Sequence, residues 1–192
     1  KKMMKRLADG KLKLVVVDPR FSKIAAKARK WVPIKPGTDA AFMLALIRWI
    51  IENDKYDKKF LGSANKAAAV VAGEQTWSNA AWLVKADGVL LRGSDLGYPK
   101  EKRKNAEGKD WEYDSFVVYK GGTLVTFDPN DEKIPVTGDL LAITTVNGLA
   151  VKSALQLVYE SAKSKTIAEW GAICDVTEAT LAAEQVKQSE ER

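Results

Sequence analysis

The chain has 192 residues, 46% of them hydrophobic, which is enough to fold one domain or one domain with a small appendage. It contains no His and a single Cys, Cys174. This composition excludes a Ser-His-Asp triad, a Cys-His pair, a CxxC redox pair and an iron–sulfur cluster bound by this chain alone. The net charge of +6 suits an anionic ligand, nucleic acid or an ordinary soluble surface, and so identifies no partner.

The first sixty residues show a β-α-β-α pattern. In chain order, the sequence predicts a buried parallel strand over 12–17, a short helix over 21–30, a second strand over 31–34 and a helix from Thr38 or Asp39 to about Asn53. Pro33 cannot donate to a ladder and favours an edge position or the end of pairing. The apolar run 40–51 contains Arg48 and is shorter than the roughly 20 residues that cross a bilayer, so we expect a core helix. Residues 1–6 are charged without a following apolar stretch and are not expected to be a secretory signal.

The pattern of residues 56–150 is less regular. It predicts helices over 66–72 and 79–84, a strand over 88–92, a charged loop over 99–109 and a hairpin over 116–127. The pair Gly121-Gly122 separates the two apolar runs of that hairpin and is typical of a primed two-residue turn. Asn147-Gly148 indicates a second turn of the same kind.

The sequence of the last forty residues predicts helices. A helix is expected over 153–164, and Thr166 with Glu169 has the spacing of a capping box that begins another. A further helix is expected after Thr177, and residues 184–192 are expected to be solvated charge. Cys174 lies among apolar residues and is expected to be a small buried side chain rather than a reactive thiol.

These elements predict an α/β fold, with a partial doubly wound (Rossmann-like) parallel sheet, helices and a hairpin-containing insertion. We expect residues 1–60 to form the nucleotide-binding half, residues 61–150 an insertion, and residues 151–192 helices that pack back on the fold. No repeat or low-complexity linker divides the chain into independent domains.

Two predicted turns carry polar groups, over residues 17–21 and 35–39. Because the carboxyl ends of adjacent parallel strands meet at one edge, the turns should lie side by side. Their carboxylates can accept from ribose or guanine, Arg20 can bind phosphate, and the following helix start favours phosphate. The alternative is that Asp18 and Thr38 or Asp39 are simple helix caps. The first turn lacks the G-x-G-x-x-G pattern of nicotinamide and flavin sites.

The residues around these turns resemble one family. Residues 14–22, 25–28 and 31–41, with the runs Val17-Asp18-Pro19-Arg20-Phe21 and Lys35-Pro36-Gly37-Thr38-Asp39, resemble the guanine-dinucleotide-binding stretch of the molybdopterin oxidoreductases in the dimethyl-sulfoxide-reductase superfamily. Residues 42–61, 155–170 and 176–181 fit the same family. Residues 88–97, 127–129 and 146–152 resemble the branch with tetrathionate reductase and respiratory arsenate reductase catalytic subunits.

The resemblance implies a bis-(molybdopterin guanine dinucleotide) cofactor, with molybdenum or tungsten, whose guanosine end lies against the two turns. Asp39 corresponds to the acidic residue that hydrogen-bonds guanine. The implied cofactor-binding residues are Val17, Asp18, Arg20, Phe21, Gly37, Thr38 and Asp39. The family's iron–sulfur region, metal-ligating residue and C-terminal cofactor-closing domain have no counterpart here. The chain alone is therefore expected to bind the guanosine end weakly or to hold no cofactor, with no catalytic residue or metal ligand.

For the intact subunit, the resemblance implies an oxidoreductase that reduces tetrathionate in anaerobic respiration, with arsenate or thiosulfate/polysulfide as alternatives. Its implied partners are an iron–sulfur electron-transfer subunit, the membrane anchor subunit of such complexes, and the rest of the catalytic subunit. The implied location is the periplasm or the outer face of the cytoplasmic membrane. The competing hypothesis is a self-contained nucleotide-binding or nucleic-acid-binding module, which would use the cluster Lys100 to Lys104. That cluster has mixed charge and lacks stacking aromatics, so we expect a solvated loop and no nucleic-acid partner.

Overall fold

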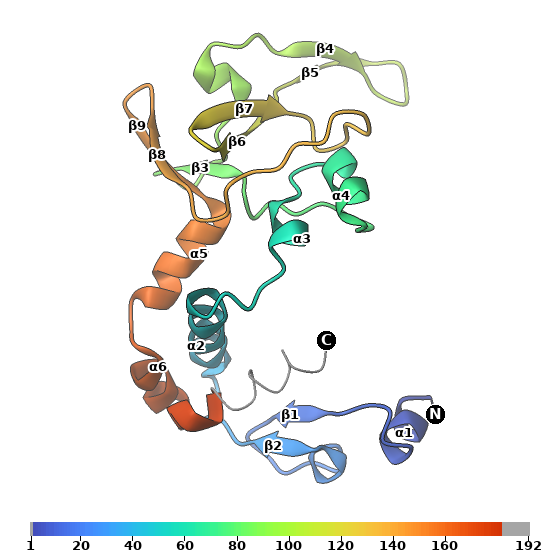
Figure 1. Cartoon of the computed structure of the whole chain (residues 1–192), viewed down its shortest axis with the longest axis vertical. Coiled ribbons are helices and arrows are strands. Elements are labelled where there is room, and N and C mark those ends of the chain that lie inside the picture. The colour runs from blue at the N-terminus through green and yellow to red at the C-terminus, as the bar shows by residue number, and fades with distance from the viewer. Residues whose placement is uncertain (1, 182–192) are drawn as a thin grey trace. The chain divides into compact units, whose positions relative to one another are not determined.

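The computed structural model describes residues 2–181 and shows a mixed helix and strand fold with several small sheets (Figure 1). The chain forms two compact units. Unit 1 comprises Lys1–Lys55 and Ser161–Arg192, and unit 2 comprises Tyr56–Glu160. Among the described residues the one parallel pairing joins β1 to β2, and the other ladders are antiparallel. This pair is part of the expected α/β arrangement, but the expected doubly wound sheet is not confirmed.

Unit 1 is built from short strands and longer helices. Its elements are α1 (Lys2–Ala8), β1 (Val15–Val17), the 3-10 turn η1 (Ala25–Lys27), β2 (Lys30–Val32), α2 (Asp39–Glu52) and α6 (Ile167–Cys174). The predicted helix over 39–53 is therefore confirmed. Its core contains small side chains on α2 and α6, which let the two helices approach closely. The buried residues are Val32, Ile34, Ala41, Ala45, Cys174, Val176 and Leu181.

Cys174 is fully buried in this core, as expected. Burial raises the pKa of its thiol, which disfavours the reactive thiolate. Thr166 and Glu169 form the predicted capping box: the Thr166 hydroxyl accepts from the Glu169 amide, and the Glu169 carboxylate accepts from the Thr166 amide. Residues 178–181 are helical, as predicted after Thr177. The expected solvated charge over 184–192 lies outside the described residues.

The expected helix over 21–30 is wrong, because only Ala25–Lys27 form a single 3-10 turn. The Arg29 amide already donates to the Leu14 carbonyl at 2.8 Å, so the chain returns to strand geometry before a longer helix can form. Strand β2 ends at Val32, directly before Pro33, which agrees with the prediction that Pro33 ends the pairing. The two strands are shorter than their apolar runs.

Unit 2 contains three antiparallel sheets within the described residues: a three-stranded sheet in the order β3-β9-β8, and the hairpins β4-β5 and β6-β7. The strands are β3 (Leu83–Lys85), β4 (Glu101–Lys104), β5 (Asp110–Tyr113), β6 (Phe116–Lys120), β7 (Thr123–Phe127), β8 (Ile143–Val146) and β9 (Leu149–Ser153). The other elements are α3 (Lys58–Gly62), α4 (Lys66–Ala72) and the 3-10 turn η2 (Gly93–Leu96), while α5 (Ala154–Lys163) runs into the second range of unit 1. Helices α4 and α5 confirm the predictions over 66–72 and 153–164.

Both predicted glycine turns of unit 2 are present. Gly121 and Gly122 have φ angles of 53° and 95° and join β6 to β7, while Asn147 and Gly148, at 48° and 80°, join β8 to β9. Positive φ at two successive positions is the requirement of a primed turn, and glycine meets it without steric cost.

Three predictions for unit 2 are wrong. Residues 79–84 are not helical, because Leu83–Lys85 form β3 and Trp82 is buried among aromatic rings. Residues 88–92 form no continuous strand and make isolated bridges at Leu90 and Arg92. The expected loop over 99–109 includes β4, and its partner β5 follows, so this stretch is mostly a hairpin. Tertiary contacts override local propensity in these segments.

Candidate functional site

The candidate site lies in unit 1, at the carboxyl ends of β1 and β2. The parallel register pairs Val15 with Lys30 and Val17 with Val32. One further hydrogen bond extends the pairing, because the Asp18 amide donates to the Val32 carbonyl at 3.2 Å. The residues after each strand therefore leave the sheet at the same edge, which is the place where α/β proteins bind ligands.

The first turn is closed by its own side chains. The Asp18 carboxylate accepts from the Arg20 amide at 2.8 Å, and the Asp18 carbonyl accepts from the Trp31 indole at 2.8 Å. The Phe21 ring meets the Trp31 ring edge to face, with 5.1 Å between centroids. Asp18 thus closes a turn rather than capping a helix, and the chain fold is fixed here without a glycine.

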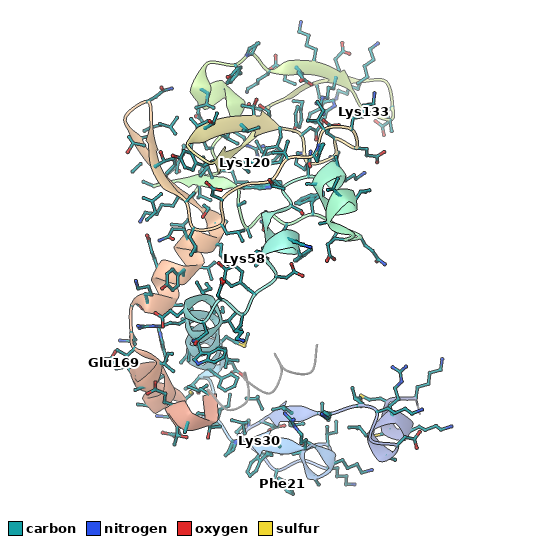
Figure 2. All side chains as sticks on the ribbon, viewed as in Figure 1. Phe21, Lys30, Lys58, Lys120, Lys133 and Glu169 are labelled. Carbon is teal, nitrogen blue, oxygen red and sulfur yellow. The ribbon has the colours of Figure 1, made fainter. Side chains whose placement is uncertain are left out.

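Closing the turn in this way leaves its other side chains available. Val17, at the end of β1, is 39% exposed, and Phe21 is 62% exposed although it contacts Trp31. The Arg20 side chain is also exposed. Figure 2 shows Phe21 projecting from the segment that holds β1 and β2. A guanidinium and a flat ring on a fixed turn can bind phosphate and cover a base or sugar.

The second turn leads directly into α2. Gly37 has a φ of 78°, a region that favours glycine. The Thr38 hydroxyl donates to the Lys35 carbonyl at 2.5 Å, and Thr38, although it is the N-cap residue of α2, makes no side-chain cap hydrogen bond. Asp39 is the first residue of the helix and is exposed.

The geometry of this helix start suits an anion and a hydrogen-bond donor together. Because Thr38 is turned toward Lys35, the first amides of α2 receive no side-chain cap. Uncapped amides at the start of a 14-residue helix attract negative charge, while the Asp39 carboxylate can accept from the N–H groups of guanine. The Lys35 amide donates to the Cys174 carbonyl at 3.1 Å, which ties this turn to α6.

The sequence missed one contributor, Trp31. Its indole N–H is the group that holds the Asp18 carbonyl, and its ring supports Phe21. A Trp at the start of an apolar strand predicts a core side chain. No local pattern indicates that the indole N–H of Trp31 bonds a carbonyl on the other side of the turn. The alternative of simple caps fails for Asp18, and Thr38 occupies the cap position without acting through its side chain.

Unit 2 has a separate polar cluster around Arg103. The guanidinium bonds Asp128 and Glu101 and lies over the Tyr113 ring, 3.6 Å from its centroid. Burial alone would raise the pKa of Asp128, but the Asn130 amide and the Arg103 guanidinium outweigh it and hold that pKa below its ordinary value. Burial and the Asp128 charge raise the pKa of Tyr113. These groups satisfy one another, so the cluster fixes the β4-β5 hairpin.

The donor set at the two turns fits the nucleotide end of a dinucleotide cofactor. Carboxylates, a guanidinium, a hydroxyl and uncapped helix amides are the groups that bind a guanine base, ribose and phosphate. The described residues contain no group of three or more His, Cys, Asp or Glu side chains that could hold a metal ion. Within residues 2–181, no helix is both long and apolar enough for a membrane span.

Exposed polar turns at the carboxyl ends of adjacent parallel strands are typical of ligand-binding sites in α/β proteins. The profile of the molybdopterin oxidoreductase family matches residues 1–172. The chain therefore belongs to the molybdopterin oxidoreductase family, and the family resemblance read from the sequence is confirmed. Family membership implies a molybdopterin cofactor.

Among curated proteins, the chain is similar to the A subunits of several reductases. It is 46% identical over 169 residues to a selenate reductase subunit of Mesobacillus selenatarsenatis, covering 85% of the chain and 15% of that protein. It is 37% identical over 194 residues to a tetrathionate reductase subunit of Archaeoglobus fulgidus, covering 97% and 16%. The corresponding tetrathionate reductase subunit of Salmonella typhimurium is 30% identical over 191 residues, covering 95% and 18%. The chain thus spans about a sixth of the length of these relatives.

Proposed function

We propose that the chain is the guanosine-binding part of the catalytic subunit of a molybdopterin guanine dinucleotide oxidoreductase. The observation that carries the proposal is the pair of turns at the ends of β1 and β2, in a chain of this family. When bound, the cofactor supplies a molybdenum or tungsten centre for oxygen-atom and electron transfer, and the residues of this chain hold only its nucleotide tail.

Each turn has a distinct part in this proposal. Asp39 accepts from the N1 and exocyclic amine of guanine, with the Gly37 and Thr38 backbone beside it. Arg20 and the α2 amides take phosphate, and the exposed faces of Val17 and Phe21 line the ribose. Asp18 keeps the first turn in shape through the Arg20 amide.

The parent subunit is proposed to reduce a chalcogen oxyanion during anaerobic respiration. Tetrathionate is supported by two similar subunits, at 37% and 30% identity over nearly the whole chain. Selenate is the second candidate, because the selenate reductase relative is 46% identical. Residues of unit 1 hold the cofactor tail, so the residues that choose between the two oxyanions are proposed to lie in the rest of the subunit.

The rest of the proposal concerns the intact enzyme. A two-stranded parallel pair is small for a nucleotide-binding sheet, so further strands of the longer protein are proposed to complete a doubly wound sheet beside β1 and β2. Residues 61–150 are then an insertion in that domain. The relatives carry the names of subunits, which supports partner subunits in the intact enzyme. We propose that these partners are a membrane anchor and an iron–sulfur subunit, and that the enzyme lies on the periplasmic side of the cytoplasmic membrane.

The experiment that tests the proposal is an NMR titration of GDP and of ADP into the purified chain. GDP should shift amides over 18–21 and 37–39, and ADP should shift them less. Asp39→Ala should weaken GDP binding about thirtyfold, because a hydrogen bond to a charged group is worth about 2 kcal/mol. Glu52→Ala, at the opposite end of α2, is the matched control and should leave GDP binding unchanged. Equal shifts from both nucleotides, or equal effects of the two variants, would contradict the assignment of Asp39.

A further inference from the structure

Positive charge is concentrated at the start of the chain. Residues 1–35 contain 12 Lys and Arg against Asp9 and Asp18, a net charge of +10. Residues 36–192 contain 19 basic against 23 acidic residues, a net charge of −4. The modest overall charge therefore conceals a strongly basic segment, whose field favours an anionic partner.

This segment also exposes apolar side chains. Helix α1 buries no residue, and its Met3 and Met4 are 47% and 37% exposed. Ile24, beside η1, is 52% exposed. We call α1 and residues 23–27 the basic N-terminal surface; its exposed basic residues are Lys2, Lys5, Arg6, Lys23 and Lys27. Exposed apolar side chains grouped with one sign of charge are typical of an interaction surface.

A hollow of about 410 Å³ lies within this surface. Met4, Leu7, Ala8 and Lys27 line it among the described residues. Three apolar side chains from one face of α1 thus form the wall, and a lysine from η1 supplies a cation. Such a hollow fits an apolar side chain that has a carboxylate next to it.

We infer that the basic N-terminal surface docks an acidic polypeptide segment, with an apolar side chain in the hollow and flanking carboxylates on the lysines. The inference rests on the proposed function, in which the chain is part of a longer subunit. Because the chain spans 15% to 18% of its relatives, polypeptide able to supply such a segment lies outside it. Charge complementarity then selects an acidic segment.

Other polyanions fit the surface less well. Single-stranded nucleic acid binds through stacking rings as well as charge, and among residues 2–35 the exposed aromatic side chain, Phe21, lies outside α1 and residues 23–27. Binding to a membrane surface scales with the apolar area that enters it, and the seven residues of α1 offer only Met3, Met4 and Leu7 as large apolar side chains. The hollow has room for an inserted side chain, and a peptide can supply one.

The test is fluorescence anisotropy with two labelled peptides, one of repeated Glu-Glu-Leu-Glu units and one in which Ala replaces each Leu. The Leu peptide should bind the chain about thirtyfold more tightly, since burying a Leu side chain is worth about 2 kcal/mol. Leu7→Gln should remove most of this difference, and Lys27→Glu should weaken both peptides about fivefold. Because α1 buries no residue, Leu7→Gln should leave the fold intact.

Matched variants separate docking from general electrostatics. Met43→Gln on α2 replaces an exposed apolar side chain elsewhere in unit 1, and Lys55→Glu reverses an exposed charge, so both should bind like wild type. Equal affinity for the two peptides, or tighter binding to duplex DNA or phosphatidylglycerol vesicles than to the Leu peptide, would overturn the inference. GDP titration of the same sample reports on the nucleotide turns alone, so its failure would count against the proposed function and not against docking.

Discussion

Unit 1 and unit 2 are stabilised by different means. Unit 2 has two buried clusters and three antiparallel sheets in the described residues, with Trp82 against three other aromatic rings. Over residues 2–55 and 161–181, unit 1 has one cluster of mainly small side chains, and its sheet there is a single pair of three-residue strands. The candidate turns lie in the unit with the smaller sheet. Their shape therefore depends on individual hydrogen bonds, such as Trp31 to Asp18 and Thr38 to Lys35.

Trp82→Ala is expected to have the largest effect on the stability difference between the two units. The change removes stacking on Trp77, contacts with Phe116 and Phe127, and the indole hydrogen bond to the Ala64 carbonyl. Loss of a large buried ring should lower the free energy of unfolding of unit 2 by about 4 kcal/mol. Hydrogen exchange should show lost protection over 81–153 with α2 retaining its protection. Equal loss in both units would show that they unfold together.

A smaller effect is expected in unit 1 from Gly171→Ala. A Cβ at this position would lie 2.4 Å from the Val176 carbonyl oxygen, so the chain after α6 must shift. We expect the free energy of unfolding to fall by about 2 kcal/mol. The amide of Lys35, which bonds Cys174, should exchange faster. Ala172→Ser at the neighbouring exposed position is the control, and a similar loss there would contradict the steric explanation.

The smallest effect concerns acid sensitivity in unit 2. The folded pKa of Asp128 is lowered, so its stabilisation is fully present above the unfolded pKa of about 3.9 and is lost as the pH falls through the folded pKa. Asp128→Asn should lower the free energy of unfolding by about 1 kcal/mol at neutral pH and flatten its fall below about pH 4. Denaturant unfolding at several pH values measures this free energy. Glu132→Gln, in an exposed pair with Lys66, should retain the wild-type pH profile, and parallel profiles for Asp128→Asn and wild type would contradict the prediction.

Turns and helix starts were predictable because short patterns determine them. The turns at Gly121-Gly122 and Asn147-Gly148 require positive φ, the Thr166 capping box satisfies helix amides locally, and Pro33 cannot donate to a ladder. The hairpin β4-β5 was not predictable in this way. Its strands are charged, and the side chain that fixes it, Arg103, bonds Asp128 from a distant part of the sequence.

The candidate site was only partly predictable. The residue types after β1 and β2 indicate a nucleotide, and parallel pairing places the two turns at one edge. An Asp side chain commonly closes a turn through the amide two residues on, but a helix cap was equally open for Asp18. No sequence pattern indicates that Thr38 turns its hydroxyl away from the α2 amides. Both turns are also held by groups from other parts of the chain, because the Trp31 indole donates to the Asp18 carbonyl and the Lys35 amide donates to the Cys174 carbonyl.

The hydrogen bond from Lys35 to Cys174 has a consequence for synthesis on the ribosome. Unit 1 is discontinuous in sequence, and all of Tyr56–Glu160 is translated between its two parts. At about 5–20 residues per second, the second turn emerges roughly seven to thirty seconds before the carbonyl that anchors it. During that interval unit 2 can already fold, so the nascent chain can complete unit 2 before the anchor of the second turn of unit 1 has formed.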